Sequence, residues 1–358
     1  MNPIRNLVAA AMSLAIAVPA FPQSVNPAAS DPAVRFVDSL PLYAPLKRVN
    51  GTVTLWGHGS FKRDFMGRLV SLWIDRFHQH QPDVRFVYQM YGTASAIGAL
   101  YTGAGNLAIL GEEISPDAAL AFRRAKGYAP TGIPIATGSL DVNFFDYAHM
   151  IFVHRDNPIE KLTLADLEAI FGTEHKRGAR NVRTWGDLGV TGEWATRRIE
   201  PYGWKVDDDF ALFFRQTVLD DSHRWNPDIH EYVHATRADG TQYDHGQRIL
   251  DALALDRFGI AISNVRYANA QVKPVALARA PGGPYHLATI ASLMAQDYPL
   301  VRIIPAFVDR APGRPLEPAV REFLRFILSR EGQQALLQES GYLPLGSEAI
   351  RQALVKLQ

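Results

Sequence analysis

The sequence predicts an α/β fold with mainly parallel sheets, and three stretches carry that prediction. Residues 52–77 begin as an apolar strand, turn through Gly57-His58-Gly59, and continue with apolar side chains at the three- and four-residue spacing of an amphipathic helix. A similar strand–turn–helix unit covers residues 84–101, and a further apolar strand follows at residues 107–110. Strands and helices that alternate in this way form right-handed βαβ units with parallel sheets.

The composition limits the classes of function. The chain has 358 residues, of which 47% are hydrophobic, enough for one large or two medium domains. Its 37 basic and 36 acidic residues nearly balance, which argues against a charge-driven partner such as nucleic acid or a membrane surface. There is no cysteine, so disulfides, thiolate metal sites and cysteine nucleophiles are excluded.

The N-terminus has the pattern of a secretory signal. Arg5 supplies a positive charge, residues 7–17 are apolar, and Val18-Pro19-Ala20 offers small residues for cleavage. We expect residues 1–20 to be a cleaved signal peptide that exports the protein to the periplasm; an uncleaved anchor is the alternative. Residues 21–49 are expected to form a leader and an N-terminal arm.

The two strand–turn–helix units place hydroxyl side chains where an anion can bind. Ser60 stands at the start of the first predicted helix, and Thr93 and Ser95 at the start of the second. The first N–H groups of a helix lack intrahelical partners and lie at the positive end of its dipole. The alternative is that these hydroxyls only cap their helices.

Acidic and imidazole side chains are further candidates. Glu112 follows the third strand, where ligands bind in open α/β sheets, although a solvated loop is the alternative. Four histidines, namely His223, His230, His234 and His245, could form a metal cluster, but we assign them to surface or packing roles and predict no metal. The sequence lacks a G-x-S-x-G elbow, an H-E-x-x-H helix and a P-loop, so we predict no enzyme.

The order of several short motifs resembles the substrate-binding proteins of phosphate-type ABC importers, which have the two-lobed type II periplasmic-binding fold. The resemblance covers nearly all of the chain after about residue 50. Its motifs are Gly59-Ser60-Phe61, Tyr91-Gly92-Thr93-Ala94-Ser95, Asn157-Pro158-Ile159, Phe258-Gly259-Ile260-Ala261, Tyr298-Pro299-Leu300 and Ser329-Arg330-Glu331-Gly332-Gln333.

The resemblance implies lobe one at residues 50–146 plus 302–358, lobe two at residues 147–301, and a two-strand hinge beside the ligand cleft. It implies a small ligand, either phosphate or another oxyanion, and the membrane subunits of an ABC importer as partners. We expect a monomer without a cofactor. The ligand-binding residues that it implies are Ser60, Phe61, Thr93, Ala94, Ser95 and Glu112.

The sequence departs from the resembled family in lobe two. Where the family has an arginine followed by Ser-Gly-Thr, this chain has Trp204 and then Asp207-Asp208-Asp209. Carboxylates that face a phosphate in a dry cleft oppose its binding. We therefore predict that orthophosphate binds much more weakly than in the resembled family, or not at all.

Three alternatives remain open at this point. Another base could replace the missing arginine: Lys205, Arg197 or Arg198. The protein could be a diverged cleft protein that acts as a sensor or interaction partner. It could also be an exported hydrolase.

Overall fold

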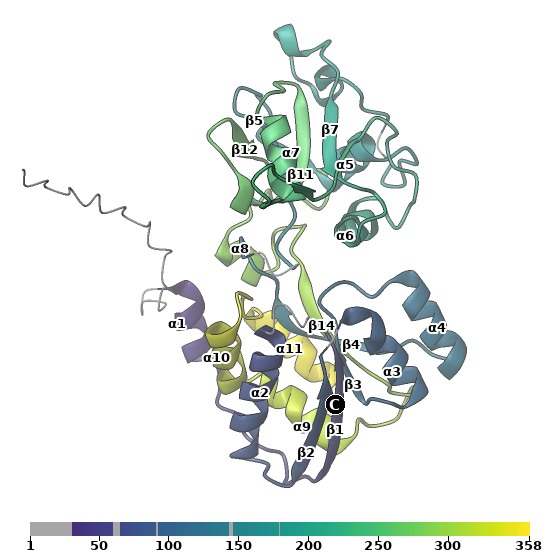
Figure 1. Ribbon diagram of the computed structural model, residues 1–358, viewed down its shortest axis with the longest axis vertical. Helices are drawn as coiled ribbons and strands as arrows, with labels where there is room; N and C mark the ends of the chain where they lie inside the picture. Colours follow the sequence, from purple (N-terminus) through teal and green to yellow (C-terminus); the bar gives the residue numbers. More distant parts are fainter. Residues whose placement is uncertain (1–30, 60–64, 91, 143–145, 179) are drawn as a thin grey trace, which may run out of the picture.

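The computed structural model describes residues 31–59, 65–90, 92–142, 146–178 and 180–358, and shows two α/β lobes joined by a narrow connection (Figure 1). Lobe one contains a five-stranded sheet in the order β2-β1-β3-β14-β4. Lobe two contains a second sheet in the order β12-β5-β11-β7-β8. The strands of lobe one are β1 (Gly51–Gly57), β2 (Val84–Gln89), β3 (Leu107–Ile109), β4 (Thr131–Thr137) and β14 (Ile303–Val308).

The strands of lobe two are shorter on average and are supplemented by two small two-stranded sheets, β10-β9 and β13-β6. The five main strands are β5 (Met150–His154), β7 (Glu200–Trp204), β8 (His230–Tyr232), β11 (Gly259–Ser263) and β12 (Val272–Pro274). The small sheets are formed by β6 (Lys161–Thr163), β9 (Ala235–Thr236), β10 (Gln242–Tyr243) and β13 (Ala276–Ala278).

Each five-stranded sheet has one strand that runs against the others. In lobe one β14 is antiparallel to both of its neighbours, β3 and β4, and in lobe two β5 is antiparallel to β11 and β12. The remaining pairs in both sheets are parallel. The reversed strand is in each case the first strand of its sheet after the chain has crossed from the other lobe, so the direction change marks the crossing.

The two crossing segments lie side by side and hydrogen-bond to each other. The backbone N–H of Gly138 donates to the carbonyl of Arg302 at 2.9 Å, and that of His149 donates to the carbonyl of Leu300 at 3.3 Å. These bonds form the two-strand hinge that the sequence predicted, and they place Arg302 at the junction of the lobes.

Helices cover the sheets and close a separate core in each lobe. The predicted stripe on α2 is confirmed, because Met66, Leu69, Val70, Trp73, Ile74 and Phe77 are all buried. The indole N–H of Trp73 donates to the carbonyl of Gly332 at 2.8 Å and ties α2 to α10. The helices of lobe one are α2 (Phe65–His78), α3 (Ala96–Thr102), α4 (Pro116–Lys126), α9 (Pro318–Ile327), α10 (Arg330–Glu339) and α11 (Ser347–Lys356), and the 3₁₀ turn η1 (Thr93–Ser95) precedes α3.

The core of lobe two is built around β5 and β11, whose residues are all buried. Its helices are α5 (Leu164–Phe171), α6 (Asp209–Val218), α7 (His245–Leu253) and α8 (Ile290–Met294), with the 3₁₀ turns η2 (Trp185–Leu188), η3 (Gly192–Trp194) and η4 (Val265–Tyr267). No helix among the described residues is long and apolar enough to cross a membrane.

Part of the expected N-terminal arm is helical. Helix α1 (Pro32–Ser39) begins with Asp31 as its N-cap and a proline in its first turn, which is a favourable helix start. Ala33 belongs to the core of lobe two, and Phe36 packs against the cores of both lobes. The segment that follows α1 binds lobe one, where the N–H of Tyr43 donates to Glu331 at 2.8 Å.

The hinge generates a first prediction, because a Cβ atom at Gly138 would lie 2.0 Å from the carbonyl oxygen of Asp146. We expect Gly138→Ala to lower the free energy of unfolding by about 1–3 kcal/mol, since the backbone at Asp146 must move away to admit the methyl group. Urea denaturation of the purified protein measures the change.

The matched control is Gly98→Ala, in the middle of α3, where the nearest atom to a new Cβ is the hydroxyl of Tyr101 at 3.8 Å. Alanine is the better helix former, so this variant should be as stable as the parent or more stable. Equal stability of the Gly138→Ala variant and the parent would contradict the tight approach at the hinge.

Candidate functional site

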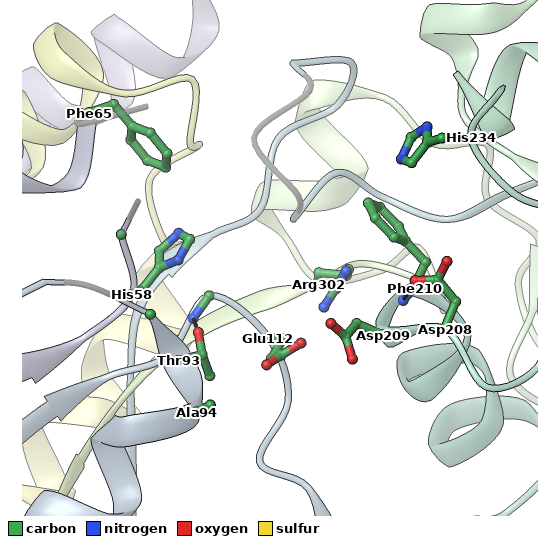
Figure 2. A pocket seen from close by; sticks show the side chains of 13 residues that line it. His58, Phe65, Thr93, Ala94, Glu112, Asp208, Asp209, Phe210, His234 and Arg302 are labelled. Carbon is green, nitrogen blue, oxygen red and sulfur yellow. Dashed lines mark hydrogen bonds between the residues drawn. The ribbon is translucent and has the colours of Figure 1, made fainter. Parts of the chain in front are cut away.

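The described residues line a cavity of about 480 Å³ at the junction of the lobes, a volume within the usual range for small-molecule sites. Figure 2 shows that side chains from both lobes and from the hinge reach it. Lobe one contributes His58, Gly59, Phe65, Gly92, Thr93, Ala94, Gly111 and Glu112; lobe two contributes Asp208, Asp209, Phe210 and His234; the hinge contributes Arg302.

The lobe-one wall is built by the ends of β1 and β3 and by the start of α3. Gly57 ends β1 with φ +137°, and a Cβ atom there would lie 1.9 Å from the carbonyl oxygen of Ile109. Glycine is therefore required for β1 and β3 to approach so closely at the site. The N–H of Gly111 donates to Thr93 Oγ1 at 3.1 Å and fixes η1 against the turn after β3.

The structure places three of the six predicted ligand-binding residues at the cavity: Thr93, Ala94 and Glu112. Ser95 is exposed, lies outside the cavity lining, and donates its hydroxyl to the carbonyl of Gly92 at 3.2 Å. Ser60 and Phe61 lie outside the described residues. The first-turn N–H groups of η1 at Thr93 and Ala94 are therefore candidate anion donors on the lobe-one wall.

Arg302 is the central cation of the cavity, although only 3% of its surface is exposed. Its guanidinium forms a two-pronged ion pair with Glu113, with Nη2–Oε2 at 2.7 Å and Nε–Oε1 at 3.3 Å. A second carboxyl group, that of Asp146, has Oδ1 at 3.9 Å from Nη2. The charge also lies 5.4 Å from the ring centre of Phe213. These partners hold a buried positive charge in a fixed place, which is the requirement for binding an anion selectively.

Carboxyl groups around Arg302 outnumber it, and burial shifts their protonation. The pKa of Glu112 is raised to about 7 by its partial burial and by the charges of Asp209 and Glu113, against the lowering effect of Arg302. The pKa of Asp146 is raised to about 8, again mainly by burial. Near neutral pH Asp146, behind the cavity lining, is therefore mainly protonated and Glu112 is partly protonated, and a protonated carboxyl group donates as well as accepts hydrogen bonds.

His58, between the two glycines of the β1 turn, takes part in a buried hydrogen-bond chain. Its Nε2 lies 2.7 Å from the hydroxyl of Tyr342, and that hydroxyl donates to Asp146. Burial, followed by the charge of Arg302, lowers the pKa of His58 to about 4. The imidazole is consequently neutral at physiological pH and adds no positive charge to the cavity.

The lobe-two wall is acidic, as the sequence indicated. Asp208 is the N-cap of α6, and its Oδ1 accepts from the N–H of Phe210 at 3.4 Å. Its carboxylate thus occupies the end of α6 where an anionic ligand would otherwise bind. Asp209 points toward Glu112 across the cavity (Figure 2), whereas Asp207 is exposed and pairs with Lys205.

None of the bases considered from the sequence replaces the missing arginine among the described cavity residues. Lys205 pairs with Asp207, Arg198 with Glu200 and Asp228, and Arg197 lies over the ring of Phe258. Trp204, at the expected arginine position, is buried in the lobe-two core beside His149, with ring centres 4.4 Å apart.

Sequence reasoning missed Arg302, although a local indication existed. The residue interrupts the apolar run from Tyr298 to Ile304 at the return crossing, and a lone arginine in an apolar strand is seldom buried without a partner. Its partner Glu113 is 189 positions away in the sequence, so the ion pair leaves no periodic pattern.

Two α/β lobes around a cavity at a two-strand hinge define a solute-binding protein of the two-lobed class. A family model described as a PBP superfamily domain matches residues 65–331. The phosphate-binding protein PstS of Pseudomonas aeruginosa is 30% identical over 332 residues, which is 92% of this chain and 92% of that protein. The chain therefore belongs to the PBP superfamily and to the family of PstS, whose members are solute-binding proteins.

Two further similarities agree with this assignment. Protein SphX of Synechococcus elongatus is 22% identical over 279 residues, 77% of this chain and 73% of that protein. The crystal structure of PstS from Borrelia burgdorferi has a TM-score of 0.54 at 12% identity and covers 83% of this chain and 100% of that chain. The fold class and the family resemblance predicted from the sequence are confirmed.

The raised pKa of Glu112 generates a second prediction. Its folded-state pKa of about 7 exceeds the ordinary 4.5, so folding favours the protonated form. The stability that this group contributes is complete below about pH 4.5 and is lost as the pH rises through about 7. We expect the unfolding free energy of the parent, relative to Glu112→Gln, to fall across that window in denaturant titrations at several pH values.

The control is the same comparison in an Asp209→Asn background. Removal of that charge lowers the pKa of Glu112, so the upper end of the pH window should move to lower pH. Parallel pH profiles for the parent and Glu112→Gln would show that Glu112 titrates as an ordinary surface carboxyl group.

Proposed function

We propose that this protein captures a phosphate-type oxyanion in the cavity between its lobes and delivers it to the membrane subunits of an ABC importer. The observation that carries the proposal is Arg302, a buried and permanently charged guanidinium at the cavity. A buried arginine held by carboxylates is the residue best suited to bind a planar or tetrahedral oxyanion with two hydrogen bonds. The 30% identity to the phosphate-binding protein PstS supports the same class of ligand.

The lobe-one residues are proposed to complete the anion site. The hydroxyl of Thr93 and the first N–H groups of η1 would donate to the oxyanion. The ionised Glu112 would accept a hydrogen bond from a hydroxyl group of the oxyanion, and the protonated Glu112 would donate one to it. Ser60 and Phe61 remain proposed contacts from the sequence. Hinge closure, as in other two-lobed binding proteins, would bring lobe two onto the bound ligand.

The acidic wall of lobe two is proposed to weaken the binding of a dianion. As the lobes close and water leaves, Asp209 and Asp208 would approach the bound charge in a medium that screens them poorly. We therefore keep the prediction that orthophosphate binds more weakly than to PstS.

The test is isothermal titration calorimetry of phosphate-free protein with orthophosphate. Asp209→Asn should tighten phosphate binding about ten- to a hundredfold, which corresponds to roughly 1.5–3 kcal/mol for one charged interaction. Asp207→Asn is the matched control: Asp207 is the neighbouring acid, is exposed, and pairs with Lys205 outside the cavity, so its loss should leave the affinity unchanged.

Two outcomes would overturn parts of this proposal. Sub-micromolar phosphate binding by the parent would show that lobe two does not oppose the ligand. No heat with phosphate in either the parent or Asp209→Asn would reject phosphate as the ligand. The acidic wall also favours a second candidate function, a cleft protein that serves as a sensor or interaction partner without an importer. The absence of heat with phosphate in both proteins would support that function.

We also propose that the protein is exported, acts as a monomer in the periplasm, performs no catalysis and binds no nucleic acid. The apolar segment at residues 7–17 and the small residues before position 20 support export. Purified periplasmic protein should therefore begin after about residue 20 by N-terminal sequencing. A mature chain that begins at Met1 would contradict cleavage.

A further inference from the structure

The lobe-two wall contains a cluster of one carboxylate and two imidazoles that the proposed function does not use. Their ligand atoms, from His234, Asp244 and His245, all lie within 4.8 Å of one another. The sequence analysis assigned the two histidines to surface or packing roles. In the structure they meet beside the cavity, because His234 belongs to its lining.

A β-hairpin explains why these residues meet. In the antiparallel pair β9–β10, Ala235 lies opposite Tyr243, so the next residues outward, His234 and Asp244, flank the hairpin at its base. Asp244 is also the N-cap of α7, where its Oδ1 accepts from the N–H of Gly246 at 2.9 Å. That bond fixes the carboxylate, and His245 follows as the first residue of the helix.

The distances fit a cation better than they fit direct hydrogen bonds. Nδ1 of His234 lies 3.9 Å from Asp244 Oδ2, and Nε2 of His245 lies 3.8 Å from Asp244 Oδ1. Both separations exceed hydrogen-bond range. Around a tetrahedral Zn²⁺ with bonds of about 2.0–2.1 Å, neighbouring ligand atoms lie roughly 3.3 Å apart, so the three ligand atoms, which lie within 4.8 Å of one another, would have to draw together by up to about 1.5 Å.

His245 provides a second, independent indication of a ligand. The residue is 1% exposed, and its Nδ1 has no hydrogen-bond partner among the described residues. A buried polar group without a partner is costly and rare in native proteins. The ring of His234 stacks on it with centres 4.0 Å apart, and His234 Nδ1 accepts from the backbone N–H of His245 at 3.2 Å, a bond that coordination through Nδ1 would replace.

We propose that His234, Asp244 and His245 bind one divalent transition-metal cation, with Zn²⁺ the best match, on the lobe-two wall of the cavity. Two imidazoles and one carboxylate are a donor set that Zn²⁺ favours, and three protein ligands leave a fourth position for water or a ligand. His234 places that open position at the cavity. The described cavity residues of lobe two include no permanently charged base. The bound cation would supply the missing positive charge for an oxyanion, a role that rests on the proposed function.

The first experiment titrates Zn²⁺ into the mature, EDTA-treated protein without phosphate and follows the heat of binding. One equivalent should bind to the parent. His234→Ala, which alters a half-exposed side chain, should weaken binding at least tenfold, as should Asp244→Asn, which keeps a good N-cap. The matched control is His230→Ala, an exposed histidine of the same lobe whose Nε2 lies 3.4 Å from Glu200, and it should bind Zn²⁺ like the parent.

The second experiment uses Co²⁺ in place of Zn²⁺ and follows its visible absorption while phosphate is added. A changed spectrum in the parent, absent from His234→Ala, is expected if the oxyanion takes the open position. No stoichiometric Zn²⁺ binding, or equal binding by His234→Ala and the parent, overturns the metal site. If phosphate gives heat of binding but Zn²⁺ does not bind, the metal site is wrong and the proposed function is unaffected. If Zn²⁺ binds but phosphate causes no response, the metal site is supported and the result counts against the proposed function.

Discussion

The buried ion pair between Arg302 and Glu113 is the interaction on which the rest of the site depends. It joins the return strand of the hinge to the turn after β3, and it lies beneath the cavity. Glu113 compensates the charge of the buried guanidinium, and the fold also buries Asp146 near it, with Oδ1 3.9 Å from Nη2. Burial is the main cause of the raised pKa of Asp146 and of the lowered pKa of His58; the charge of Arg302 opposes the first shift and adds to the second.

The two lobes contribute different chemical groups to the cavity. Lobe one and the hinge hold the cation and the N–H donors, while lobe two presents carboxylates at the start of α6. The superfamily fold is unchanged by that difference, because the α6 turn can carry Ser-Gly-Thr or three aspartates with equal ease as a helix start. Ligand preference therefore resides in a few side chains of the cavity wall rather than in the fold.

Local patterns were sufficient to predict most of the fold, because each element carries its own indication. The α2 stripe, the glycine turn after β1 and the strand–turn–helix order are all short-range features. Helix α1 was missed even though Asp31 and Pro32 form a favourable start, since its eight residues are too few for a clear period.

The candidate site could be predicted only in part, for a different reason. Thr93, Ala94 and Glu112 stand at element ends, where α/β proteins bind ligands, and the sequence therefore indicated them. Arg302 and Glu113 are brought together by the hinge over a long separation, which no local pattern records. His234 and Asp244 meet through a hairpin whose Asp239-Gly240 pair was a usable turn indication that the sequence analysis did not use.

Helix α1 has a mechanical consequence for the proposed closure of the hinge. It contacts α10 of lobe one and α8 of lobe two, with Phe36 packed against both cores. A rotation of one lobe against the other must therefore slide one of these two contacts, because a short rigid helix cannot follow both bodies. Helix α1 thus links the two lobes outside the hinge, so the proposed closure must rearrange one of its contacts as well as bend the crossing strands.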